Sequence, residues 1–390
     1  AHLGLPAWDA LYDEVERLLD VSLVPESRWN RHNQLLRTGV EALGWRGGGL
    51  SHNRTGCVGS GYCEIGCAYD AKNNALKVFA PRFVAAGGVV VTRCQAVQVL
   101  HEAGAVVGVD AALIDPEGWQ QRGRLVVRAP RVCVSASATG TAALLLRSGV
   151  PDSSGTTGTT LRIHPAVMVA GDFEEPVHAW KGIPQTYECT EHLRFDGSDR
   201  RLWIVPAFGH PVAVATLVSG HGAEHRGWME RYAHLAAFTA MLHDHTAGVV
   251  TPDGPLGLQI DYWPDGGDRA QLSLGIEHCA RLLFAAGARR VVVPGHPVRV
   301  LESAAQLGSL AGLSLTRGAT DISAVHPMGS VAMSDDPELG PVDSRGEHHG
   351  VRGLWVSDGS LFPESIGVPP QLSIYALGLH VGRAIATASL

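Results

Sequence analysis

The chain has 390 residues, of which 45% are hydrophobic, and a formal net charge of −7. Such a chain can bury a large core, and its length predicts two or three domains, while the negative charge argues against a nucleic-acid partner. No apolar stretch approaches the roughly 20 residues that span a bilayer, and no signal peptide can be read, so we favour a cytoplasmic location.

The first 50 residues are predicted to form a helical segment. Apolar residues recur at helical spacing between Trp8 and Leu19, which predicts an amphipathic helix there.

A glycine-rich loop with three cysteines follows, at Cys57, Cys63 and Cys67. Glycines let the backbone wrap, so that several thiolates can converge on a metal ion or an iron–sulfur cluster. Three cysteines are one ligand short of a zinc site or a four-iron cluster. A disulfide with one free thiol, or a purely structural loop, are the alternatives.

Short strands are expected next, at 89–92, 96–100 and 125–127, with another near Gly108. Residues 132–149 then read as a buried strand, a turn of small residues and an apolar helix that ends at a glycine. Small residues in such a turn allow a cofactor to approach the backbone closely, although ordinary strand-to-helix packing needs them too.

The middle of the chain, 171–320, is predicted to be a mostly antiparallel sheet. Strands are expected within 173–187, 201–206, 257–263 and 290–293, and helices at 228–244 and 270–286. Four aromatic residues of this region could line an apolar pocket: Trp180, Trp203, Tyr262 and Trp263.

The last third carries three segments that can meet at one ligand. His326 lies in a tight turn with Pro327 and Gly329, a strand over 354–357 ends in Asp358, and the loop at 367–374 opens a helix. Oxidation of an alcohol needs a base beside a hydride acceptor, and neutral histidine suits that task near pH 7. The acceptor must be a cofactor, because no side chain takes hydride.

The order and spacing of these segments resemble the C-terminal signature of the glucose-methanol-choline family of FAD-dependent oxidoreductases, especially its cholesterol oxidase and long-chain alcohol oxidase branches. The resemblance implies an α/β fold, with a Rossmann-like FAD-binding domain from 50–170 and 321–390 and an antiparallel-sheet substrate domain from 171–320. It implies FAD as cofactor and His326 as the base. The substrate would be a small-molecule alcohol, apolar and long-chain or sterol-like.

The resemblance also assigns cofactor contacts, at Val97, Ser137, Asp358, Gly359, Pro369, Pro370 and Gln371. Pro369 departs from the family pattern, because relatives carry Asn or His there as a second polar catalytic residue. Proline has no side-chain donor, so a second hydrogen bond to the substrate oxygen would have to come from elsewhere.

No strand followed by Gly-x-Gly-x-x-Gly and a helix occurs in the sequence, although that unit normally binds the ADP half of FAD. We therefore expect the FAD-binding domain to be incomplete and the chain to be a piece of a longer protein.

Two other functions are compatible with these features. The cysteine spacing resembles that of bacterial sugar dehydrogenase subunits, in which a three-iron, four-sulfur cluster passes electrons to an acceptor protein, and equally a loop of long-chain alcohol oxidase-like proteins. A degenerate flavoprotein that binds a ligand without catalysis is the other alternative, favoured by Pro369.

Overall fold

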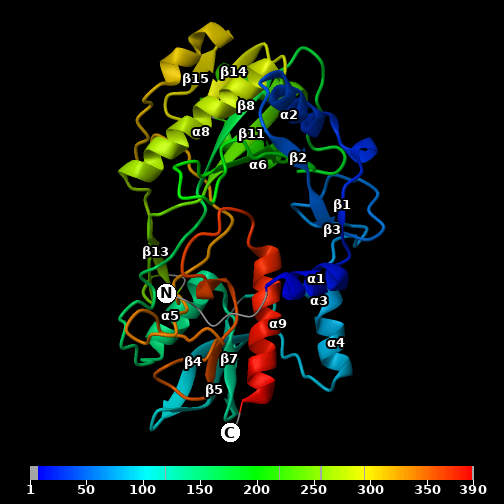
Figure 1. Ribbon diagram of the computed structural model, residues 1–390. Coiled ribbons are helices and arrows are strands. Elements are labelled where there is room, and N and C mark those ends of the chain that lie inside the picture. Colours follow the sequence, from blue (N-terminus) through cyan, green and yellow to red (C-terminus); the bar gives the residue numbers. More distant parts are fainter. Residues whose placement is uncertain (1–7, 119, 219, 255–256, 294, 389–390) are drawn as a thin grey trace.

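The computed structural model describes residues 8–388 except for 119, 219, 255–256 and 294. Figure 1 shows two lobes: an upper one built on a sheet and the long helix α8 (Gly266–Ala285), and a lower one around α9 (Gln371–Thr387). Within the described residues, no helix is long and apolar enough to cross a membrane.

The upper lobe contains the predicted antiparallel sheet. In the described part of the chain its seven strands follow the order β15 (Arg299–Leu301), β14 (Arg290–Val293), β8 (Ala166–Asp172), β11 (Leu235–Leu242), β10 (Leu202–Ala207), β9 (Tyr187–Cys189) and β2 (Gly47–Gly49). Every neighbouring pair is antiparallel. The sheet also recruits residues from outside 171–320, since β2 precedes that range and β8 begins before it.

One face of this sheet packs against α8, which confirms the helix predicted at 270–286. The helix begins earlier because the Asp265 side chain caps it by accepting from the Asp268 backbone N–H. Beside α8 lies α2 (Arg31–Ala42). Residues with almost no solvent exposure form this core, among them Leu36, Val169, Phe238, Leu272, Ile276 and Val291.

The helix predicted at 228–244 is wrong. A short helix, α7 (Ala223–Glu230), overlaps only the start of that range, and residues 235–242 form the central strand β11. The strand carries apolar residues on both faces, because Phe238 packs into the core beneath α8 and Met241 packs with Trp203 and Val205 on the opposite face. A continuous apolar run of this kind cannot be distinguished from a helix by periodicity.

Two stretches predicted as strands are mostly irregular. Within 173–187 only Tyr187 enters a strand, because Pro176 and Pro184 interrupt the segment, and His178 and Gln185 adopt left-handed backbone angles of φ +50°. Residues 89–92 form an exposed loop.

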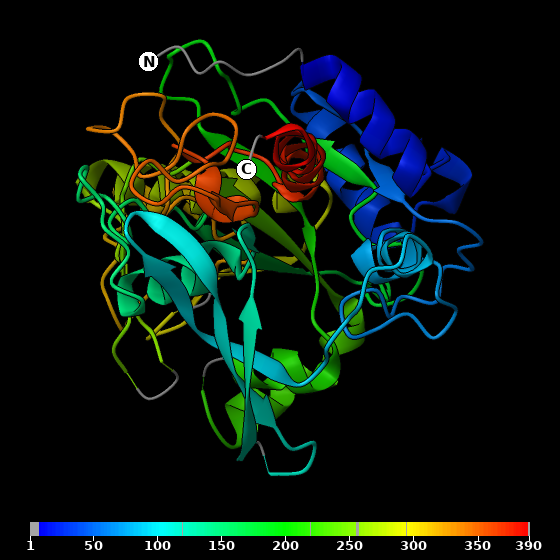
Figure 2. The same ribbon diagram turned by 90° about the horizontal axis from the view of Figure 1, so that it is seen from below.

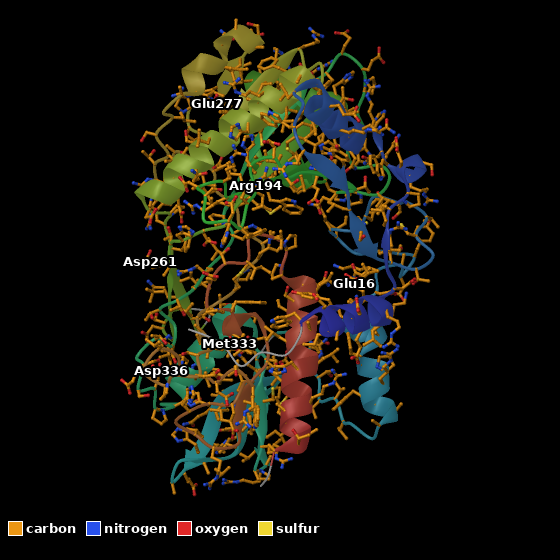
Figure 3. All side chains as sticks on the ribbon, in the orientation of Figure 1. Glu16, Arg194, Asp261, Glu277, Met333 and Asp336 are labelled. Carbon is orange, nitrogen blue, oxygen red and sulfur yellow. The ribbon has the colours of Figure 1, made fainter. Side chains whose placement is uncertain are left out.

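The lower lobe is organised by a pair of parallel strands, β7 (Val132–Val134) and β16 (Leu354–Val356). Helix α5 (Ser137–Arg147) follows β7, which confirms the predicted strand, turn and helix. Figure 2 shows α9 end-on beside these strands. The core here includes Leu145, Met333 (labelled in Figure 3), Trp355 and Leu377.

Smaller elements complete the chain. A separate antiparallel sheet of the described residues contains β4 (Cys94–Glu102), β5 (Ala105–Ile114) and β6 (Gln121–Arg128). The others are α1 (Trp8–Leu19), as predicted, β1 (Val21–Leu23), β3 (Ser51–Asn53), α3 (Ala75–Val78), α4 (Ala80–Ala85), α6 (Pro211–Leu217), β12 (Val249–Thr251) and β13 (Gln259–Asp261). Short 3-10 helices occur at Glu26–Arg28, Tyr232–His234, Ala304–Leu310 and Gly359–Leu361.

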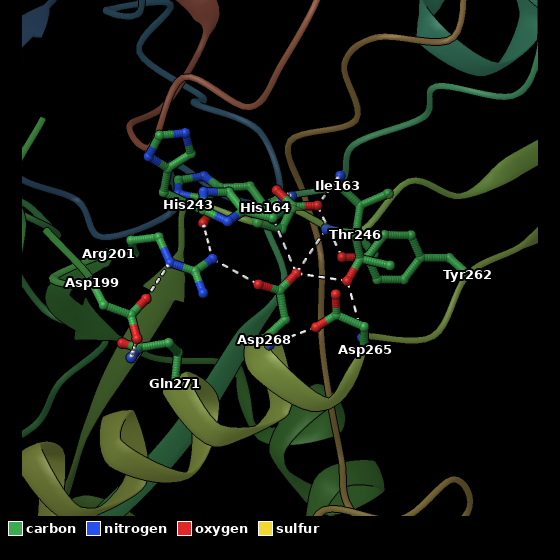
Figure 4. A network of polar contacts seen from close by, with 12 residues as sticks. Ile163, His164, Asp199, Arg201, His243, Thr246, Tyr262, Asp265, Asp268 and Gln271 are labelled. Atoms are coloured by element: carbon green, nitrogen blue, oxygen red, sulfur yellow. Dashed lines mark hydrogen bonds and ion pairs between the residues drawn. The ribbon is translucent and has the colours of Figure 1, made fainter. Parts of the chain in front are cut away.

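A buried ion pair lies where the upper sheet meets the segments that lead to the lower lobe (Figure 4). Arg201 donates to the Asp268 carboxylate at 2.6 Å and to the carbonyl of His243 at 2.9 Å. Asp268 also accepts from the hydroxyl and backbone N–H of Thr246. Burial would raise the pKa of Asp268, but the hydrogen bonds from Thr246 and Arg201 outweigh it and hold the pKa below its usual value.

A second buried carboxylate, Asp244, fixes the turn at His164. Its oxygens accept the backbone N–H of Ile163 at 3.1 Å, the backbone N–H of His164 at 3.2 Å and the hydroxyl of Tyr262 at 2.9 Å. His164 has a left-handed backbone (φ +54°), which non-glycine residues adopt at a cost. Asp244 therefore holds a strained residue in place.

Replacement of Asp244 by Asn should destabilise the fold more than replacement of Tyr262 by Phe. The Asn side chain would turn its NH₂ group toward backbone donors and leave at least one of them buried and unpaired, at a cost of about 1–3 kcal/mol. Tyr262→Phe removes a single hydrogen bond, worth about 1 kcal/mol. Urea unfolding of both variants measures the difference, and equal midpoints would contradict this role of Asp244.

Candidate active site

Two of the predicted cofactor turns lie side by side at the carboxyl ends of β7 and β16. The backbone N–H of Ser357 donates to the carbonyl of Val134 at 3.0 Å, and the hydroxyl of Thr141 donates to Asp358 at 2.5 Å. Ligands of α/β proteins bind at this end of parallel strands. The parallel pairing thus brings Ser137, the first residue of α5, next to the turn of Asp358.

The loop after His326 is fastened to both of these turns. The backbone N–H of Gly329 donates to the carbonyl of Gly359 at 2.9 Å, and the hydroxyl of Ser330 donates to the carbonyl of Ala138. Gly329 has φ +71°, and a side chain there would collide with the carbonyl of Thr160. A glycine is therefore required where the imidazole loop crosses the lower lobe.

A cleft of about 450 Å³ opens at the amino end of α9. Pro369 and Gln371 line it from that end, and Trp203 of β10 lines it from the sheet. The first backbone N–H groups of a helix have no partner within the helix and attract electron-rich groups. Of the four aromatic residues predicted to line a pocket, Trp203 lies in this cleft.

His326 is paired with a second histidine. The backbones of Arg162 and Met328 exchange two hydrogen bonds of 2.8 Å, an antiparallel bridge that places His164 opposite His326. The Nδ1 atoms of the two rings are 3.0 Å apart, so one ring donates and the other accepts. His326 is not among the residues that line the cleft; its partner His164 lies near the backbone of Gly367, the residue before Val368 in the cleft lining.

Both rings are neutral near pH 7. His164 is completely buried, and burial, followed by the neighbouring His326, lowers its pKa to about 3. Burial also lowers the pKa of His326, which is half-buried. A neutral histidine carries a proton on one ring nitrogen and a free lone pair on the other. A general base needs that lone pair to accept a proton.

No local pattern in the sequence pairs His326 with His164. Both precede a proline, but so do His210 and His296. Only the long-range bridge between Arg162 and Met328 selects His164, and no local pattern records that bridge.

Val97 lies apart from these residues. It occupies a β-bulge in β4, on the separate sheet of the lower lobe, and its side chain is 38% exposed.

The three clustered cysteines line the same cleft as Pro369. Burial raises the pKa of the Cys63 thiol, and the nearby Cys57 and Cys67 raise it further. All seven cysteines are free, and the described residues contain no group of three or more His, Cys, Asp or Glu side chains placed to hold a metal ion. The predicted iron–sulfur cluster is therefore not supported, and the loop serves as a wall of the cleft.

Several known proteins are similar to this chain in sequence. A mycobacterial relative, an uncharacterized GMC-type oxidoreductase of Mycobacterium tuberculosis, is 36% identical over 97% of this chain and 59% of its own length. A long-chain-alcohol oxidase of Arabidopsis thaliana is 26% identical over 91% of this chain and 49% of its own length. The chain thus spans about three fifths or less of these two relatives.

A solved structure, pyridoxine 4-oxidase from Mesorbium loti, has the same fold. It superposes with a TM-score of 0.69 over 95% of this chain and 72% of its own, at 16% sequence identity.

The family model of GMC oxidoreductases matches in two parts, an N-terminal one at residues 3–166 and a C-terminal one at residues 230–378. These ranges contain the turns of Ser137 and Asp358, the loop of His326 and the amino end of α9. The chain belongs to the GMC oxidoreductase family.

Proposed function

We propose that this protein oxidises the CH–OH group of an apolar alcohol, with FAD as cofactor and His326 as the base. The single observation that carries the proposal is the pair of neutral histidines next to the loop at the amino end of α9. Family membership supports the reaction type, and relatives named long-chain-alcohol oxidases support an apolar substrate.

The residues at the cleft fit a flavin. The amino end of α9 offers unpaired backbone N–H groups beside Pro369 and Gln371, which suit the electron-rich pyrimidine edge of the ring. Outside the cleft lining, at the turn after β16, Ser360 has a buried hydroxyl without a hydrogen-bond partner in the described part of the chain, next to the carboxylate of Asp358. FAD, when bound, supplies the acceptor for the hydride.

His164 determines which nitrogen of His326 can accept a proton. The backbone of Gly367 lies near the His164 ring and opposes part of the loss of basicity, although the Nε2 atom of His164 makes no hydrogen bond within the described residues. We assign the proton of His164 to Nε2, which leaves its Nδ1 free to accept from the Nδ1–H of His326. His326 then has its lone pair on Nε2, where it can take the hydroxyl proton of the substrate.

The same contact remains favourable after proton transfer. His326 then carries protons on both nitrogens, and its Nδ1–H still donates to the neutral His164. His164 thus supports the base by a hydrogen bond from behind. This support replaces part of the polar assistance that Pro369, which has no side-chain donor, cannot provide.

Replacement of His326 by Ala should lower alcohol-dependent flavin reduction about 10²–10⁴-fold in the full-length protein, the usual range for loss of a general base. Because burial lowers the pKa of His326, the rate in the unmodified protein should fall only below pH 6.5, as the base becomes protonated. Stopped-flow absorbance measures both effects. The exposed His221→Ala serves as control. Unchanged reduction in His326→Ala would refute the assignment and mean that the base is elsewhere and His326 is only structural.

Replacement of His164 should affect the same rate through His326. His164→Ala removes the acceptor, so the base loses its orientation and the rate should fall about 10²-fold. His164→Asn keeps an acceptor and tolerates the left-handed backbone, so it should restore much of the rate. The acid limb of the pH profile should move toward pH 6.5 in the Ala variant, because His326 becomes more hydrated. Equal rates in the Ala and Asn variants, with flavin bound, would mean that His164 is only structural.

A further inference from the structure

A second cavity, of about 270 Å³, lies in the upper lobe. Its floor is the sheet, at Ala170 and Ala207, and its roof is formed by α6 and α7 with Val214 and Trp228. We call it the upper chamber. Glu64 is the only charged residue among the described ones that line it, and the rest of the wall is almost entirely apolar. Such a wall excludes ionic groups and favours hydrocarbon.

The upper chamber and the cleft lie on the same face of the same sheet. Side chains alternate along a strand, so Trp203, Val205 and Ala207 of β10 share one face. Trp203 lines the cleft and Ala207 lines the upper chamber. Their separation of four positions along the strand corresponds to about 13 Å at the usual rise of a strand. A ligand in the cleft can therefore reach the upper chamber only if it is long.

The cysteine loop borders both cavities on this face. Cys63 lines the cleft, and the next residue, Glu64, lines the upper chamber. Tyr62 stacks on His210 at the start of α6, with ring centroids 5.1 Å apart, and the loop also packs closely on the backbone of Trp180. The loop thus forms a shared wall of both cavities and supports the chamber's roof.

The roof itself contributes little to the core. Among the described residues, neither α6 nor α7 contains a fully buried one, and Val212 of α6 is 79% exposed. Segments with few buried contacts open at low free-energy cost. A chain can therefore enter the upper chamber from the side of α6 without disruption of the sheet.

We infer that the upper chamber binds the hydrocarbon tail of the substrate, an unbranched aliphatic alcohol whose hydroxyl end lies in the cleft. The inference rests on the proposed alcohol oxidation and specifies its substrate class. It follows from the apolar wall, the common sheet face and the cysteine loop that both cavities share. The cleft alone would select for the hydroxyl group, and the upper chamber would select for chain length.

The test uses decyl methyl ether, which lacks a hydroxyl group and cannot be oxidised, and butyl methyl ether as the short probe. Calorimetric titration of the full-length flavoprotein measures their binding. Ala170→Phe fills the chamber floor, and loss of three buried methylene groups should raise the Kd for the decyl ether by about 50-fold. The Kd for the butyl ether should not change. Val212→Phe adds the same bulk at an exposed position outside the chamber and serves as control.

If Ala170→Phe does not fold, as judged by its thermal melt, Ala207→Leu offers a smaller filling of the same floor. Equal decyl ether affinity in the unmodified and filled proteins would overturn the inference, even if the protein oxidises alcohols. Loss of decyl ether binding in the filled variant would support the upper chamber even if no alcohol is oxidised, which would contradict only the proposed function. With turnover, the filled variant should lose kcat/KM for decanol and retain it for butanol.

Discussion

The site depends on one backbone contact, the bridge between Arg162 and Met328. These two residues lie in segments that are distant in sequence, one ahead of β8 and the other ahead of the loop that grips the turns at α5 and Asp358. The bridge fixes the register in which His164 faces His326. A shift of one residue would turn these side chains to opposite faces and separate the two rings.

Buried carboxylates support this bridge from the upper lobe. Asp244 binds the backbone of Ile163 and His164, and Asp268 with Arg201 orders the neighbouring segment around His243 and Thr246. Buried ion pairs are a poor source of stability, because desolvation offsets much of their attraction. The main effect of this network is therefore on geometry. Through a few hydrogen bonds it fixes the backbone at His164 relative to the upper sheet, and thereby the orientation of the His326 ring.

The parts of the fold that could be predicted are those with local signals. The strand, turn and helix over 132–149 end at a glycine after an apolar run, and the helix that follows Asp265 has a side-chain cap. The strand β11 was missed because its burial on both faces depends on distant neighbours. His326, Asp358 and Gln371 could be grouped from the order of their motifs. The partner of His326 could not, since its position follows from a tertiary register that no local pattern contains.

The makeup of the upper sheet constrains how the chain can fold. β2 pairs with β9 across roughly 140 residues, and β8 pairs with both β11 and β14. During synthesis, more than 60 residues are added after β8 before its first partner strand, β11, begins. The sheet is complete only when β15 has been synthesised. Pairings between such distant segments slow folding, because the intervening loop must close before any contact repays its entropy. The exposed apolar edge of β8 in that interval is therefore the segment on which a chaperone would act.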